Sequence, residues 1–106
     1  MANFVLLYTG GSMPSSEADT KVVIQAWTEW YNGLGAAVVD PGNPFTPMAK
    51  SVASDGKVSD GPVGTMATGY TVIKADSLDA ATRMAKGCPV LKGGAQITVY
   101  ETFPVM

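Results

Sequence analysis

The chain has 106 residues, of which 46% are apolar and 15% are charged, a composition that suits one folded domain and excludes a disordered chain. Seven basic residues are outnumbered by nine acidic ones and form no cluster, so we expect no nucleic-acid partner. The apolar runs are too short for a membrane span, and the N-terminus lacks the pattern of a secretory signal, so we expect no membrane association.

Two absences restrict the chemistry. Cys88 is the single cysteine, which excludes an intrachain disulfide and favours a reducing compartment, the cytoplasm. The chain has no histidine, so the usual base at neutral pH and the usual transition-metal ligand are both missing. We therefore expect neither a metal nor a cofactor.

The first half of the chain predicts a strand, a helix and a second strand. Residues 3–8 alternate in the manner of a strand, and both of its faces are apolar. Residues 18–33 carry an apolar stripe at helical spacing, on which we expect Trp27 to be mostly buried. The stripe consists of Val23, Ala26, Trp27, Trp30, Tyr31 and Leu34. Residues 36–40 predict a short second strand.

A long connection follows the second strand and has no regular period. It is rich in proline, and residues 51–58, centred on Asp55-Gly56, predict a small hairpin inserted into it. A second turn is expected at residues 60–62, where the sequence reads Asp-Gly-Pro.

The second half of the chain repeats the order of the first. Residues 68–75 alternate as a strand does, and Ser77 is a good N-cap for a short helix at 78–86. The last strand is expected at 95–102, before an apolar C-terminal tail.

Two such units predict one α+β domain over residues 1–106, with the ferredoxin-like order βαββαβ. We expect a four-stranded antiparallel sheet, two helices on one of its faces and the small hairpin insertion. Two helices cover only one face, yet the first strand is apolar on both faces. A second copy packed on the other face, which makes a dimeric α/β barrel, is the simplest cover.

Four short motifs resemble a known family. They are the Asp-Gly-Pro turn at 60–62, the Gly-Tyr strand start at 69–70, the Ser-Leu-Asp-x-Ala helix start at 77–81 and the Cys-Pro pair at 88–89. Their order and spacing resemble the DGPF branch of the YCII-related proteins. The resemblance implies a dimeric α/β barrel with a cleft beside the sheet, in a family of which a few members act on small aromatic or chlorinated compounds.

The chain also departs from that family. Val63 stands where the DGPF signature has phenylalanine. In narrower YCII members, the resemblance implies a functional pair: a histidine on the first helix and an aspartate just before the proline that follows the second helix. This chain has Ile24, Trp27 and their neighbours on the helix and Cys88 before Pro89, so the His/Asp pair is absent and its catalysis is not carried over.

Aromatic residues are the candidates for ligand binding. Trp27, Trp30, Tyr31 and Tyr70 can line a pocket in which a flat ligand stacks, or they can be plain core residues. Core packing is the simpler interpretation for Trp27.

The candidates for catalysis are Asp60, Asp40 and Tyr8. Asp40 and Tyr8 end the first two strands and can point at a cleft shared with Asp60, which burial would make a base. Asp60 is also explained as a turn residue that bonds its own backbone, and this structural interpretation is favoured. Cys88 follows a helix end, so no helix dipole lowers its pKa, and a buried structural thiol is favoured.

Three functions remain open. The first is a protein that binds a small apolar or aromatic molecule in a barrel cleft. The second is a cofactor-free enzyme with Asp60 or Asp40 as base and Tyr8, Tyr70 or Tyr100 as acid. The third is a structural homodimer without a ligand. A carboxylate and a tyrosine hydroxyl within hydrogen-bond reach favour the enzyme, and an apolar cavity favours the binder.

Overall fold

The computed structural model describes residues 1–12 and 16–105 and contains two sheets. Four strands form an antiparallel sheet in the order β2-β5-β1-β6, and β3 pairs with β4 in a separate two-stranded sheet. The elements are β1 (Ala2–Thr9), α1 (Glu17–Leu34), β2 (Val38–Asp40), β3 (Lys50–Val52), β4 (Val58–Asp60), β5 (Ala67–Ala75), α2 (Leu78–Ala85) and β6 (Gln96–Glu101).

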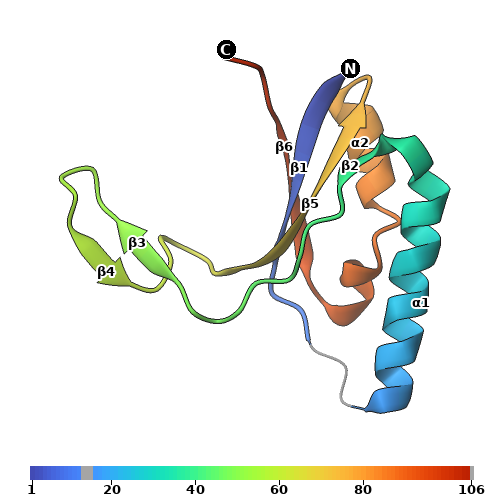
Figure 1. Cartoon of the computed structure of the whole chain (residues 1–106), viewed down its shortest axis with the longest axis horizontal. Coiled ribbons are helices and arrows are strands. Elements are labelled where there is room, and N and C mark those ends of the chain that lie inside the picture. The colour runs from blue at the N-terminus through green and yellow to red at the C-terminus, as the bar shows by residue number, and fades with distance from the viewer. Residues whose placement is uncertain (13–15, 106) are drawn as a thin grey trace.

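The expected ferredoxin-like α+β fold is confirmed. Both helices lie on the same side of the four-stranded sheet (Figure 1), and β5 lies between β2 and β1, as the split βαβ arrangement requires. The second strand was expected from residue 36 but begins at Val38, because Gly35–Ala37 forms a 3₁₀ turn. Gly35 opens that turn with φ 57°, which favours glycine. Among the described helices none is long and apolar enough to cross a membrane.

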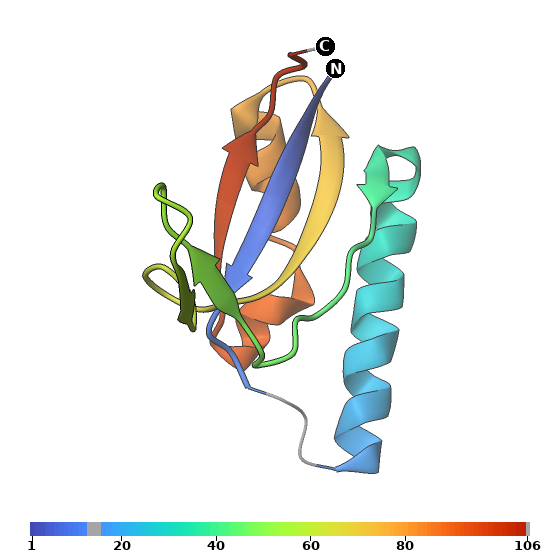
Figure 2. The same cartoon turned by 60° about the vertical axis from the view of Figure 1, so that its left-hand side comes forward.

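The expected hairpin insertion is present and is larger than residues 51–58, because its strands extend to Lys50 and Asp60. We call residues 41–66 the arm. The arm projects from the side of the sheet opposite the helices (Figures 1 and 2). It is attached where the Phe45 N–H donates to Thr68 O at 2.8 Å.

The core lies between the sheet and α2. Phe4, Leu6 and Ile73 have no exposed surface, and they alternate with residues that face the other way. Helix α2 presents two small residues to them, Ala81 and Ala85, which allows its backbone to approach the sheet closely.

Helix α1 packs differently. Ser16 caps its start by accepting a hydrogen bond from the Asp19 N–H, but no residue of the helix is fully buried. Val23, expected on the buried stripe, is 37% exposed. Trp27 is only partly exposed and packs against the core, in keeping with the expectation that it is mostly buried.

Candidate functional site

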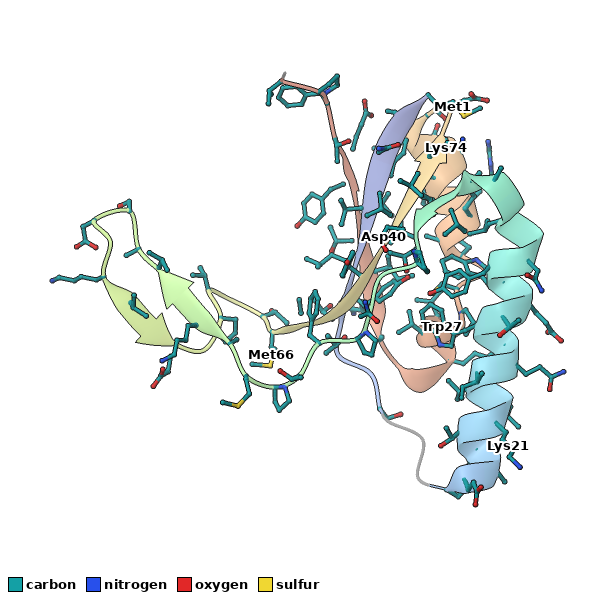
Figure 3. All side chains as sticks on the ribbon, in the orientation of Figure 1. Met1, Lys21, Trp27, Asp40, Met66 and Lys74 are labelled. Atoms are coloured by element: carbon teal, nitrogen blue, oxygen red, sulfur yellow. The ribbon has the colours of Figure 1, made fainter. Side chains whose placement is uncertain are left out.

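Four aromatic rings meet between α1 and the sheet. Trp27, Trp30 and Tyr31 come from one face of α1, and Tyr8 comes from β1. The Trp27 ring lies 5.6 Å from both Trp30 and Tyr31 and 5.8 Å from Tyr8, edge-on to Tyr8 and Trp30. We call these four residues the aromatic cluster. Figure 3 shows Trp27 pointing from α1 toward the sheet.

A chain of hydrogen bonds runs beneath the rings. The Cys88 thiol lies 3.6 Å from the Tyr8 hydroxyl, which donates to Thr71 Oγ1 at 2.6 Å. Thr71 in turn donates to the Pro41 carbonyl at 3.0 Å, and the Tyr31 hydroxyl donates to the same carbonyl, also at 3.0 Å. The chain therefore joins β1, β5, α1 and the root of the arm.

The inner end of this chain is closed to water. Thr71 is fully buried, Cys88 is 2% exposed and Tyr8 is 4% exposed. Burial raises the pKa of the Tyr8 hydroxyl and of the Cys88 thiol, and burial also raises the pKa of Tyr31. All three groups keep their protons at neutral pH, so Cys88 is no thiolate nucleophile and each group acts as a donor within the chain of hydrogen bonds.

The outer rings are less enclosed. Trp27, Trp30 and Tyr31 are half-buried, and Trp30 is anchored because its indole N–H donates to the Met84 carbonyl at 3.1 Å. Rings fixed in this way present rigid faces and edges beside the buried hydroxyls. The outer rings are therefore aromatic groups, partly accessible to solvent, beside a buried chain of hydroxyls.

A second group lies at the junction of β2 and the arm. The Asp40 carboxylate accepts from the Tyr70 hydroxyl at 3.1 Å and from the Gly42 N–H at 2.9 Å. The Phe45 ring stacks on Tyr70 at 5.7 Å. The hydrogen bond to Asp40 raises the pKa of Tyr70, so Tyr70 acts as a donor. Gly42 has φ 71°, and a Cβ there would lie 1.8 Å from the Tyr70 carbonyl oxygen, which makes glycine necessary.

The three catalytic candidates do not meet in one cleft. Tyr8 points to the helix side, together with Phe4 and Leu6, whereas Asp40 bonds Tyr70, which faces the other side of the sheet. Asp60 lies in β4 on the arm, where its carboxylate is 2.8 Å from the Lys50 amine and its side chain is 90% exposed. Asp60 therefore forms an exposed ion pair at the end of a strand, whereas the turn sequence had favoured a hydrogen bond to its own backbone.

Sequence reasoning missed Thr71 and Phe45. Thr71 had a detectable signal, because it is a hydroxyl residue on the same alternating face as Ile73, and a polar group at a buried position needs a partner. Phe45 had no detectable signal in the sequence, since it lies in an irregular connection whose path depends on the sheet.

Two hollows on the surface lie away from both the aromatic cluster and the Asp40–Tyr70 pair. One of about 540 Å³ is on the arm, bordered by Pro47, Met48, Lys50 and Asp60. Another of about 340 Å³ lies where β5 meets α2. Within the described residues no group of three or more acidic or thiol side chains is arranged to hold a metal ion.

No family model and no curated protein matches the sequence. A solved structure does: 5-chloro-2-hydroxyhydroquinone dehydrochlorinase (TftG) from Burkholderia phenoliruptrix AC1100, in complex with 2,5-dihydroxybenzoquinone. The two chains are 20% identical, the match covers 94% of this chain and 93% of the other, and the TM-score is 0.53. At this identity the likeness shows a shared fold, the ferredoxin-like α+β fold described above.

Proposed function

We propose that the protein is a YCII-like protein of the DGPF type that binds a small aromatic molecule at the aromatic cluster. The observation that carries the proposal is the construction of α1. An 18-residue helix without one fully buried residue places three rings over a buried chain of hydroxyl groups. A helix selected only for packing would bury small or aliphatic residues, as α2 does with Ala81 and Ala85.

The chemistry of the cluster favours a flat ligand with polar edges. Each additional aromatic contact is worth about 0.5–1.5 kcal/mol beyond the burial of its area. Tyr31 supplies a hydroxyl at the half-buried rim, next to the buried hydroxyls of Tyr8 and Thr71. The structural neighbour was solved with 2,5-dihydroxybenzoquinone, a molecule of this kind, which supports the ligand class.

Isothermal titration calorimetry with 2,5-dihydroxybenzoquinone tests the proposal. We expect a saturable heat with a dissociation constant below about 1 mM, and an affinity roughly tenfold lower for Trp27→Ala, the loss of about 1.4 kcal/mol. Val22→Ala, a change on the outer face of the same helix where Val22 is 67% exposed, should leave the affinity unchanged. Equal affinity of Trp27→Ala and the wild type, or no heat at all, would refute the site.

The proposed assembly is a homodimer, formed through the sheet face that the helices leave open. Val5, Leu7 and Val72 on this face are only half-buried in one chain. A second copy of the chain can bury this face, because in a two-fold symmetric dimer the same surface of both subunits is covered by a single interface. We place the protein in the cytoplasm, where the thiol of Cys88 stays reduced.

A second candidate function rests on Asp40 and Tyr70. Their 3.1 Å hydrogen bond is the pairing of carboxylate and hydroxyl that a cofactor-free enzyme requires, with Asp40 as base and Tyr70 as acid. Chloride release from 5-chloro-2-hydroxyhydroquinone provides the assay. If this candidate is correct, wild-type protein releases chloride and Asp40→Asn does not, whereas Asp60→Asn, on the exposed arm, retains the activity. Activity that survives Asp40→Asn would exclude the pair.

A further inference from the structure

The arm combines features that a segment of a monomer rarely has. Its paired strands are only three residues each, and an isolated two-stranded hairpin is marginally stable in water. It is nevertheless rich in exposed apolar side chains. Those of the arm are Phe45 (45% exposed), Met48 (84%), Val52 (70%), Val58 (60%), Val63 (87%) and Met66 (36%).

The arm is built to a defined shape at its root. Phe45 stacks on Tyr70, its N–H bonds Thr68, and Pro44 forms a bridge with Gly69. Farther out, the Ser51 hydroxyl donates to the Gly61 carbonyl at 2.6 Å. An ordered arm has already lost much of the conformational entropy that a flexible loop would lose on binding.

The direction of the arm matches the open face. In Figure 1 the arm and the helices leave the sheet on opposite sides, and the arm root at Phe45 is continuous with Tyr70 on the open face. The four charges of the arm, Lys50, Asp55, Lys57 and Asp60, sum to zero. Approach of the arm to a second copy therefore meets no net repulsion, although the whole chain is acidic.

The open face of the sheet is small compared with the interfaces of obligate dimers. Strands β2, β5, β1 and β6 have three, nine, eight and six residues, so at ~3.3 Å per residue and ~4.8 Å per strand the face covers roughly 400 Å² per subunit. Two such faces in contact bury about 800 Å², less than half of the ~2,000 Å² at which obligate dimers begin. The flat sheets alone are therefore too small for a stable obligate dimer.

We infer that the arm of each subunit clasps the second copy, so that Val52, Val58 and their exposed neighbours become part of the dimer interface. This inference rests on the proposed homodimer. It adds that the arm, and not the sheet face alone, determines its strength. By two-fold symmetry the interface contains two identical arm contacts, so each change in the arm counts twice.

The test uses a double variant that keeps the hairpin. Val52 and Val58 are directly opposite in the β3-β4 register, so Val52→Glu with Val58→Lys replaces an apolar cross-strand pair with an oppositely charged pair. The matched control is Val22→Glu with Ile24→Lys at two exposed positions of α1, where the residues are 67% and 60% exposed. Neither variant changes the net charge.

Analytical ultracentrifugation across micromolar concentrations measures the dimer dissociation constant. We expect at least a tenfold increase for the arm variant and no change for the α1 variant. An unchanged constant in the arm variant overturns the clasp but leaves the homodimer intact, and a monomeric wild type overturns both. Equal weakening by the two variants also overturns the clasp.

Hydrogen exchange of the unmodified protein gives a second readout that depends on no substitution. Amides of residues 50–60 should be better protected above the dissociation constant than below it, while those of α1 stay the same. Equal protection of the arm at both concentrations contradicts the clasp.

Discussion

The two faces of the four-stranded sheet are formed by the same strands but differ in how far their side chains are buried. On the helix side Phe4, Leu6 and Ile73 are completely buried by the chain's own atoms. On the open side Val5 and Leu7, which alternate with them along β1, are only half-buried. Since the strand is apolar on both faces, the difference lies in the cover and not in the strand.

The two helices repeat this contrast on the covered side. Helix α2 is eight residues long and buries two alanines, whereas α1 is 18 residues long and buries none fully. Helix α2 contributes small, fully buried residues to the core, whereas α1 contributes large, partly exposed rings. The following predictions separate these roles.

Phe4→Ala should have the largest effect on stability. Phe4 has no exposed surface, and truncation of a fully buried phenylalanine costs about 3–5 kcal/mol of unfolding free energy. Urea denaturation followed by circular dichroism measures it. A loss below about 1 kcal/mol would show that the helix side is not the core.

Leu7→Glu, on the opposite face of the same strand, should act on assembly. We expect light scattering at micromolar concentration to report twice 11.0 kDa for the wild type and 11.0 kDa for the variant. The expected weakening is at least about 100-fold, or ~2.7 kcal/mol, because a charge would replace an apolar group at the centre of the proposed interface. Val22→Glu, with the same charge on the outer face of α1, is the control and should remain dimeric.

Trp27→Ala should cost an intermediate amount. Its ring is half-buried, so we expect roughly 2 kcal/mol, less than the loss for a fully buried aromatic residue. Chemical denaturation of the ligand-free protein measures the change, and Val22→Ala provides the baseline of a surface position. A loss as large as that of Phe4→Ala would place Trp27 in the core and weaken the case for a binding site.

Alkaline pH should produce the smallest effect. Burial raises the pKa of Cys88 above 9.0 and that of Tyr8 above 10.0, their ordinary values in the unfolded chain. Above about pH 9 the unfolded chain therefore binds fewer protons than the folded one, so stability falls as pH rises and is fully present below that pH. Urea midpoints at pH 8, 9.5 and 10.5 measure the slope.

The control for this slope is a pair of variants. Tyr8→Phe should flatten the fall above pH 10, because the buried hydroxyl is gone, whereas Val22→Ala, at a 67% exposed position on α1, should not. Identical slopes in the wild type and Tyr8→Phe would contradict the closed site.

Local patterns were sufficient for most of the fold. The alternation in residues 3–8 and 68–75 and the helical stripe after Ser16 predicted elements within two residues of those observed, because these patterns follow from the backbone repeat. The boundary error at residues 36–37 arose where Gly35 turns the chain, a conformation that depends on the neighbouring helix end.

The candidate sites divide in the same way. The rings of Trp27, Trp30 and Tyr31 were identified from their spacing on one helix, and the structure brings them together. Asp40 and Tyr70 were among the possible bases and acids, but the sequence did not single out their pairing, because 30 residues and the whole arm separate them along the chain.

By itself the sequence determined the elements, their order and the excess of apolar surface on β1. Those properties depend on composition and on residues that are close together in the sequence, so they can be read from the sequence alone. Only the tertiary structure decided which carboxylate meets which hydroxyl, that the aromatic rings of α1 lie between this helix and the sheet, and that the arm turns away from the helices. These outcomes depend on contacts between distant segments, where sheet register and side-chain volume decide what can approach.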